Sequence, residues 1–141
     1  MLHGKGGVPQ DYAEALKWFR KAAEQGHAEA QYRLVMSYTF GFGVPKDNAE
    51  AIKWCRKAAE QGHAAAQYKL GNCYFRGIGV ADDDVAAYAW HSVAAASGYE
   101  KARNMLGVTK SMLTASELEK GEAMAREISE RIEKRRAGRA E

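Results

Sequence analysis

The hydrophobic pattern of residues 47–63 predicts an amphipathic helix with a marked beginning and end. Its apolar positions recur at helical spacing and form one face, made of Ala51, Ile52, Trp54, Cys55, Ala58 and Ala59. Charged residues such as Lys53 and Lys57 fall on the opposite side. Asp47 is a suitable N-cap because its carboxylate can accept a hydrogen bond from a first-turn N–H group. Gly62 supplies a residue that can adopt the left-handed conformation at the helix end.

The same helix pattern returns along the chain at a period of 36 residues. Residues 11–27 differ from residues 47–63 at only three of 17 positions, and residues 84–99 are a weaker copy. Self-similarity at a fixed period of this length is typical of repeat proteins. The sequence therefore predicts a helical array rather than a globular domain with a single core.

A second helix follows each copy, over residues 28–40, 64–76 and, more weakly, 100–110. Its apolar residues share one face, as shown by Ala30, Leu34 and Tyr38 and their counterparts Ala66, Leu70 and Tyr74. Neither helix of a unit can bury its apolar face alone, so stability requires stacking of neighbouring units. We expect an all-α protein, an α/α superhelix in the form of a right-handed solenoid of 36-residue helical hairpins.

Glycine-rich loops over residues 4–9, 41–45 and 77–80 separate the helices of successive units. A phosphate-binding loop would need a preceding strand and a following Gly-Lys-Ser/Thr, and neither is present. We expect these glycines to adopt positive φ in tight turns between helices.

Candidate catalytic and metal-binding residues are few. The sequence contains no Ser-x-x-Lys or Gly-x-Ser-x-Gly motif. His27 and His63 occupy the same turn position in successive repeats, which favours a structural role over metal binding. His91 replaces apolar residues of the other copies and is expected in the core, and the acidic run at residues 82–84 is expected to cap a helix. We therefore predict no enzymatic activity, no catalytic or metal-binding residue and no cofactor.

A run of thirteen residues resembles a known family. The run comprises Ala66, Leu70, Gly71, Tyr74, Gly77, Gly79, Val80, Asp83, Ala87, Trp90, Ala94, Ala95 and Gly98. Their joint spacing is similar to the Sel-one-like repeat, an α/α solenoid unit related to the tetratricopeptide repeat. The resemblance covers about residues 4–110, with departures at Lys5, Val35 and Lys110. It implies three repeats over residues 1–110, of which the first is truncated at its N-terminus.

The resemblance also implies a function. Proteins built of these repeats act as scaffolds that bind another protein or a peptide, often in bacterial signalling, envelope or host-interaction roles. The alternative is penicillin binding or a cryptic hydrolase activity, as in the cysteine-rich Helicobacter type. Those relatives carry cysteines at the positions of Ala59 and Ala66, and this chain does not. The helix geometry places Cys55 and Cys73 too far apart for a disulfide, so we expect both to be reduced packing residues.

The two ends of the array lead to separate predictions. Leu2 occupies the slot of Tyr38 and Tyr74, so the helix from Asp11 is expected to expose apolar surface. The chain would then be a fragment of a longer array, or it would self-associate through this edge. At the other end, a capping box at residues 114–117 predicts a C-terminal capping helix over residues 111–136, followed by a frayed tail at residues 137–141.

The balance of charge bears on partners and localisation. The chain has 141 residues and a net charge of +3, with acids and bases interspersed. Lys134, Arg135, Arg136 and Arg139 are therefore expected to form a solubilising tail rather than a nucleic-acid site. No apolar run reaches the roughly 20 residues of a membrane span. As given, the chain suits the cytoplasm, or the periplasm or exterior if an upstream signal peptide is missing.

The partner is expected on the inner, concave face of the solenoid, which the second-helix segments line. The residues opposite the buried stripe of these helices are Tyr32, Met36, Thr39, Tyr68, Asn72, Phe75, Asn104 and Val108. Aromatic residues and methionine on a solvated face are suited to anchoring an interface. For Tyr32 and Tyr68, which recur, packing between neighbouring helices is the alternative.

Overall fold

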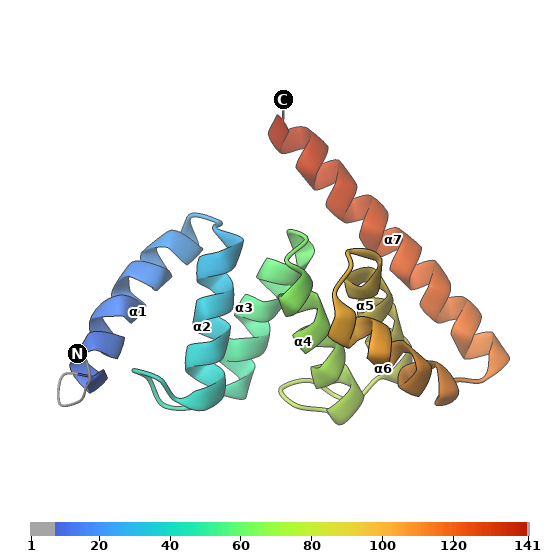
Figure 1. The fold of residues 1–141 in the computed structure, drawn as a ribbon, viewed down its shortest axis with the longest axis horizontal. Helices are drawn as coiled ribbons and strands as arrows, with labels where there is room; N and C mark the ends of the chain where they lie inside the picture. Colours follow the sequence, from blue (N-terminus) through green and yellow to red (C-terminus); the bar gives the residue numbers. More distant parts are fainter. Residues whose placement is uncertain (1–7, 141) are drawn as a thin grey trace.

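The computed structural model describes residues 8–140, with side chains over residues 12–139. This part of the chain consists of seven helices, with no strand among them (Figure 1). Their bounds are α1 Val8–Glu24, α2 Ala28–Phe40, α3 Asn48–Glu60, α4 Ala64–Arg76, α5 Asp84–Ala96, α6 Glu100–Ser111 and α7 Ala115–Ala140. The prediction made for Leu2 concerns a residue outside this part.

The first six helices follow one another across the molecule in chain order (Figure 1). Helix α2 packs against α3 and α4 packs against α5, and we call each of these pairs, joined by a glycine-rich loop, a hairpin. The sequence predicts pairs across the Gly–His turns instead, α1 with α2 and α3 with α4, and these pairs are also in contact. The hairpins join through α3 against α4 and through α5 against α6. Each helix is thus covered by its neighbours along the chain, and the predicted all-helical α/α solenoid is confirmed.

Glycines shape the loop between the two helices of a hairpin. Gly77 ends α4 with φ 70°, and Asp83 caps α5 by accepting a hydrogen bond from the Ala86 N–H at 3.0 Å. Between them, Gly79 has φ 78°, and an added Cβ there would lie 2.6 Å from Ile52 Cγ1. The loop therefore packs directly against the preceding hairpin, and the glycines serve the turns as predicted.

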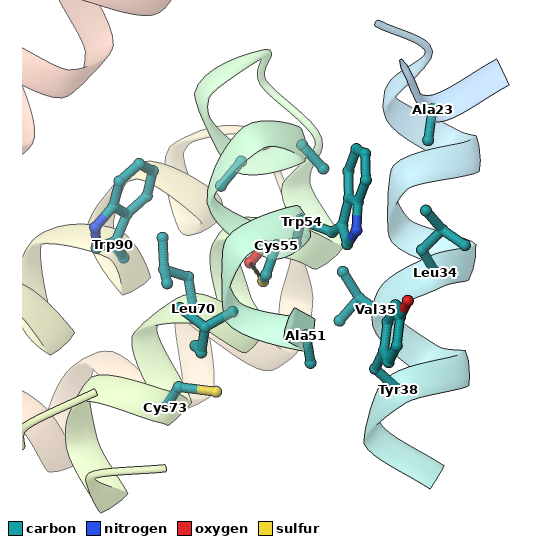
Figure 2. Close-up of a cluster of buried hydrophobic side chains, with 14 of the residues drawn as sticks. Ala23, Leu34, Val35, Tyr38, Ala51, Trp54, Cys55, Leu70, Cys73 and Trp90 are labelled. Carbon is teal, nitrogen blue, oxygen red and sulfur yellow. Dashed lines mark hydrogen bonds between the residues drawn. The ribbon is translucent and has the colours of Figure 1, made fainter. Parts of the chain in front are cut away.

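Three tryptophans at the 36-residue period report how well each part of the array is covered. Trp54 is 6% exposed and Trp90 is 2% exposed. Figure 2 shows Trp54 on α3 beside the side chains of α2. Trp18 on α1, in contrast, is 63% exposed. Helix α1 thus presents apolar surface, as expected from the sequence, and self-association through it stays a prediction.

Helix α7 packs against α5, on a face that is charged in the preceding hairpin. Lys53 and Lys57 of α3 are exposed, whereas their counterparts on α5 are Ala89 and Val93, which are 0% and 5% exposed. Ile128 of α7 is buried in the core cluster that contains these two residues. The loss of charge makes α5 apolar all round, which is typical of a helix buried on every side.

The ends of α7 are held by polar contacts. The Thr114 N–H donates to Glu117 Oε1 at 2.9 Å, and the Glu117 N–H donates to Thr114 Oγ1 at 3.1 Å, so the predicted capping box is formed. Near the other end, Arg131 binds both carboxylate oxygens of Glu60 at 2.9 and 2.7 Å. The diagonal course of α7 over the array is visible in Figure 1.

The C-terminal tail differs from the prediction. Helix α7 continues to Ala140, so residues 137–140 are helical rather than frayed. Arg139 donates a hydrogen bond to Gln61 Oε1 at 2.8 Å, which ties this last turn to the turn between α3 and α4. Alanine and arginine are also strong helix formers, so Gly138 alone does not end the helix. None of the described helices has the length and hydropathy that crossing a membrane requires.

Candidate functional site

A hollow of about 370 Å³ opens between α2 and α4, with α3 at its base. We call it the groove. Five of the eight residues predicted to bind a partner line it, namely Tyr32, Met36, Thr39, Tyr68 and Asn72. Phe75, Asn104 and Val108 do not line it. These three residues belong to a later part of the array. Phe75 is the counterpart of Thr39 one repeat later, and Asn104 and Val108 lie on α6.

The floor of the groove is apolar. Val35 of α2 and Ile52 and Cys55 of α3 line it, and their exposed fractions are 0%, 8% and 1%. Met36 stands at the wall, half-buried, with a flexible thioether side chain that adapts to irregular surfaces. The arrangement suits the burial of an apolar side chain from outside.

Two ring pairs connect successive repeats along the groove. Tyr32 stacks on His63 with ring centroids 4.8 Å apart, and Tyr68 lies 5.3 Å from Tyr99. The two pairs are equivalent positions in the 36-residue period. The tyrosines thus pack against the next repeat, which was the alternative interpretation, and still contribute to the groove wall. Burial raises the pKa of the Tyr32 phenol, so it stays neutral.

The charges at the groove are all positive. Lys69, Arg76 and Lys101 line it, and no aspartate or glutamate does. Lys69 extends toward α2, with its Nζ 5.9 Å from the centroid of the Phe40 ring. These cations were not predicted from the sequence, because only the residues opposite the buried stripe were expected at the groove. Two of them could have been found on α4, since Lys69 directly follows Tyr68 and Arg76 lies in the last turn of the same helix.

The two cysteines are buried and free. Cys55 donates its S–H to the carbonyl oxygen of Ala66 at 3.1 Å, and burial raises the pKa of its thiol to about 12. Burial also raises the pKa of the Cys73 thiol. Figure 2 shows the two side chains on separate helices, α3 and α4. Because the thiolate is the nucleophilic form, neither residue is suited to covalent catalysis at neutral pH.

His27, His63 and His91 have structural positions. His91 is 0% exposed, its Nε2 lies 2.9 Å from Asn72 Oδ1, and burial lowers its pKa to about 4. His27 and His63 are the N-cap residues of α2 and α4, which confirms that they share one structural slot. In the part of the chain that the structure describes, no group of three His, Cys, Asp or Glu side chains could hold a metal ion. The groove thus offers apolar and positively charged side chains for contact.

Comparison with known proteins identifies the repeat. The Sel1 repeat profile matches residues 1–27, 28–63 and 64–99, so the second match spans α2 and α3 and the third spans α4 and α5. No curated protein matches the chain.

Two solved structures extend the comparison. The protein c5321, described as a protective antigen present in uropathogenic Escherichia coli strains displaying an SLR fold, is 39% identical with a TM-score of 0.82. That match covers 85% of this chain and 26% of c5321. A Sel1 repeat protein from Oxalobacter formigenes is 44% identical with a TM-score of 0.67, and the match covers 68% of this chain and 40% of that protein. The chain thus spans less than half the length of either relative, and it belongs to the Sel1 repeat family.

Proposed function

We propose that this chain is a non-enzymatic scaffold that binds a protein or peptide partner in the groove between α2 and α4. Sel1 repeat proteins are commonly interaction scaffolds, which supports the general class of function. A role in bacterial signalling, the envelope or contact with a host is part of the proposal. The likeness to c5321, which is described as a protective antigen, supports the last of these.

The observation that carries the proposal is an open groove with an apolar floor at the residues selected from the sequence. Its volume of about 370 Å³ suits one or two inserted side chains rather than a whole folded surface. Binding energy in protein interfaces is concentrated in a few anchor residues that fill such pockets. Met36 at the groove wall is the residue that such an anchor would contact.

The test compares two substitutions that differ in place but not in chemistry. Met36→Glu puts a charge at the groove wall, whereas Val108→Glu puts one on α6 at the same repeat position, where the side chain is 44% exposed. Each variant is first checked for unchanged helicity and melting. In a pull-down from the source cell extract, we expect Met36→Glu to lose the proteins that the unsubstituted chain retains and Val108→Glu to keep them. Equal retention by all three chains would refute the groove assignment.

A further inference from the structure

The cations of the groove form no ion pair with a carboxylate of the described residues. Ion pairs elsewhere in the described residues join neighbouring helix positions, as in Lys53 with Glu50, or distant helices, as in Arg131 with Glu60. Lys69, Arg76 and Lys101 take part in none of the ion pairs found among the described residues. They converge on one hollow from α4 and from the start of α6. The groove therefore carries a local excess of positive charge.

We infer that the groove takes an acidic peptide segment with an apolar anchor residue, an inference that rests on the proposed function. The anchor enters over the floor formed by Val35 and Ile52, and carboxylates beside it meet Lys69 and Arg76. Charge complementarity of this kind steers encounter and rejects partners of the wrong sign. The Lys69 ammonium lies 5.9 Å from the centroid of the Phe40 ring, a weak attraction that favours a position at the groove.

A nucleic acid is the other polyanion that could be attracted here, and the groove is less suited to it. Single-stranded nucleic acids bind by stacking their bases on exposed aromatic rings. Here the Tyr32 ring stacks on His63, and the Tyr68 ring packs against Tyr99. Phe40 is the exposed ring of the groove lining, at 49%, and one such ring beside an apolar floor is not a row of stacking platforms. An acidic segment of a protein uses both features of the groove, the charge and the apolar floor.

The experiment uses labelled probes of opposite charge and one double variant with a matched control. The probes are a random Glu–Tyr copolymer, a Lys–Tyr copolymer and a mixed-sequence single-stranded DNA, each titrated with the chain by fluorescence anisotropy. Lys69→Gln with Arg76→Gln removes two groove cations. Lys53→Gln with Lys57→Gln removes two exposed cations that do not line the groove, so the change in net charge is the same.

The expected result is binding of the Glu–Tyr copolymer that weakens with salt and falls about tenfold in the groove variant, because that variant loses two exposed charge contacts with the probe. The control variant should retain most of the affinity. Equal binding of the two copolymers, or an equal loss in both variants, would overturn the inference. Tighter binding of DNA, lost in the groove variant, would overturn it in favour of a nucleic acid.

Failure of this inference is separable from failure of the proposed function. If Met36→Glu abolishes capture of protein partners while the Glu–Tyr copolymer does not bind, the groove is a protein site without preference for acidic segments. If neither experiment shows an effect at the groove, both proposals fall. A Met36→Lys variant adds a sharper contrast, because an acidic partner should tolerate lysine better than glutamate at this position by several-fold.

Discussion

The α2–α3 and α4–α5 hairpins share one backbone arrangement and fill its centre differently. The first has Val35 on α2 and Cys55 on α3, and in the second the equivalent residues are Gly71 and His91. An added Cβ on Gly71 would lie 2.6 Å from His91 Cδ2, so the glycine is what makes room for the imidazole. The larger residue on α5 thus goes with the smaller residue on α4, which is how close-packed interiors tolerate substitution.

A polar contact differs between the same two hairpins. Gln31 and Gln67 are buried at equivalent positions, and each donates to a carbonyl oxygen of the preceding helix at 3.1 Å. Gln31 Oε1 also accepts a hydrogen bond from Gln61 at 2.8 Å. The counterpart of Gln61 is Ser97, and Gln67 Oε1 is buried without a partner. The α4–α5 hairpin therefore has one buried acceptor without a hydrogen bond, whereas the equivalent acceptor in the α2–α3 hairpin has one.

The largest difference between the two hairpins lies on their outer faces. Helix α7 covers this face of α5, whereas the equivalent face of α3 carries the exposed residues Lys53 and Lys57. Together these differences show that the residues of one repeat are fitted to its neighbours rather than to a consensus. The following predictions test that fit, beginning with the largest expected effect.

Ala89→Lys should restore the charge that α3 carries and separate α7 from α5. The side chain is 0% exposed, so an unpaired ammonium there costs about 4 kcal/mol or forces α7 away. Urea unfolding and hydrogen exchange of the α7 amides measure the two outcomes. The control is Lys53→Ala, which removes an exposed ion pair and should change stability by less than about 1 kcal/mol. Similar small losses in both variants would contradict the docking of α7.

Acidification should weaken the fold through His91. Its pKa lies at about 4 in the folded chain against 6.5 for the free side chain, so the unfolded state binds more protons between these values. The stability contributed by neutral His91 is complete above pH 6.5, is lost progressively as the pH falls toward 4, and amounts to about 3 kcal/mol. Chemical unfolding across this pH range measures it. The control is a Gly71→Val, His91→Cys double variant, which recreates the α2–α3 pair and should lack this part of the pH dependence.

Two glycine substitutions should have opposite signs. Gly71→Ala drives a methyl group into His91 and should destabilise the chain by about 2 kcal/mol. Gly107 is its counterpart on α6, where an added Cβ meets nothing within 4 Å, so Gly107→Ala should stabilise the helix by about 0.5–1 kcal/mol. Thermal unfolding of both variants distinguishes them. A shared sign would show that helix propensity, not the fit to His91, governs this position.

Ser97→Gln should supply the missing donor to Gln67 Oε1. Satisfying a buried acceptor is expected to stabilise the chain by about 1 kcal/mol. The reciprocal change Gln61→Ser should remove the equivalent bond to Gln31 and destabilise by a similar amount. Urea midpoints of the two variants provide the measurement. The prediction is wrong if Ser97→Gln is neutral while Gln61→Ser is destabilising.

Much of the fold could be predicted from the sequence because its signals are periodic. The 36-residue repeat, the bounds of α2 and α4 and the capping residues Asp47 and Asp83 are each specified by local chemistry that the structure preserves. The lining of the groove could also be predicted in part, because helical spacing opposite Leu34 leads directly to Met36, and Asn72 lies at the equivalent position one repeat later. That these residues bind a partner stays a prediction. Periodicity does not determine how far the groove extends along the array. For this reason Phe75 was expected at the groove although it does not line it.

The features that escaped prediction depend on contacts between distant parts of the chain. Ala89 and Val93 stand where the preceding repeat has Lys53 and Lys57, and in the sequence this change made residues 84–99 a weaker copy of the repeat. In the structure the two residues form part of the surface on which α7 packs. The helical tail depends on Arg139 meeting Gln61, which are far apart in sequence. Predicting the groove cations would have required knowing which sides of α4 and α6 face the groove. Each of these needs the three-dimensional arrangement.

The central claim is that a partner inserts into the groove beside Met36. A photoreactive benzoylphenylalanine at position 36, and separately at position 108, tests it directly when each chain is irradiated with the partner that the unsubstituted chain captures. The account predicts a covalent adduct from position 36 and none from position 108, where the side chain is exposed on α6 away from the groove. Adducts from position 108 together with none from position 36, in chains that bind the partner normally, would contradict it.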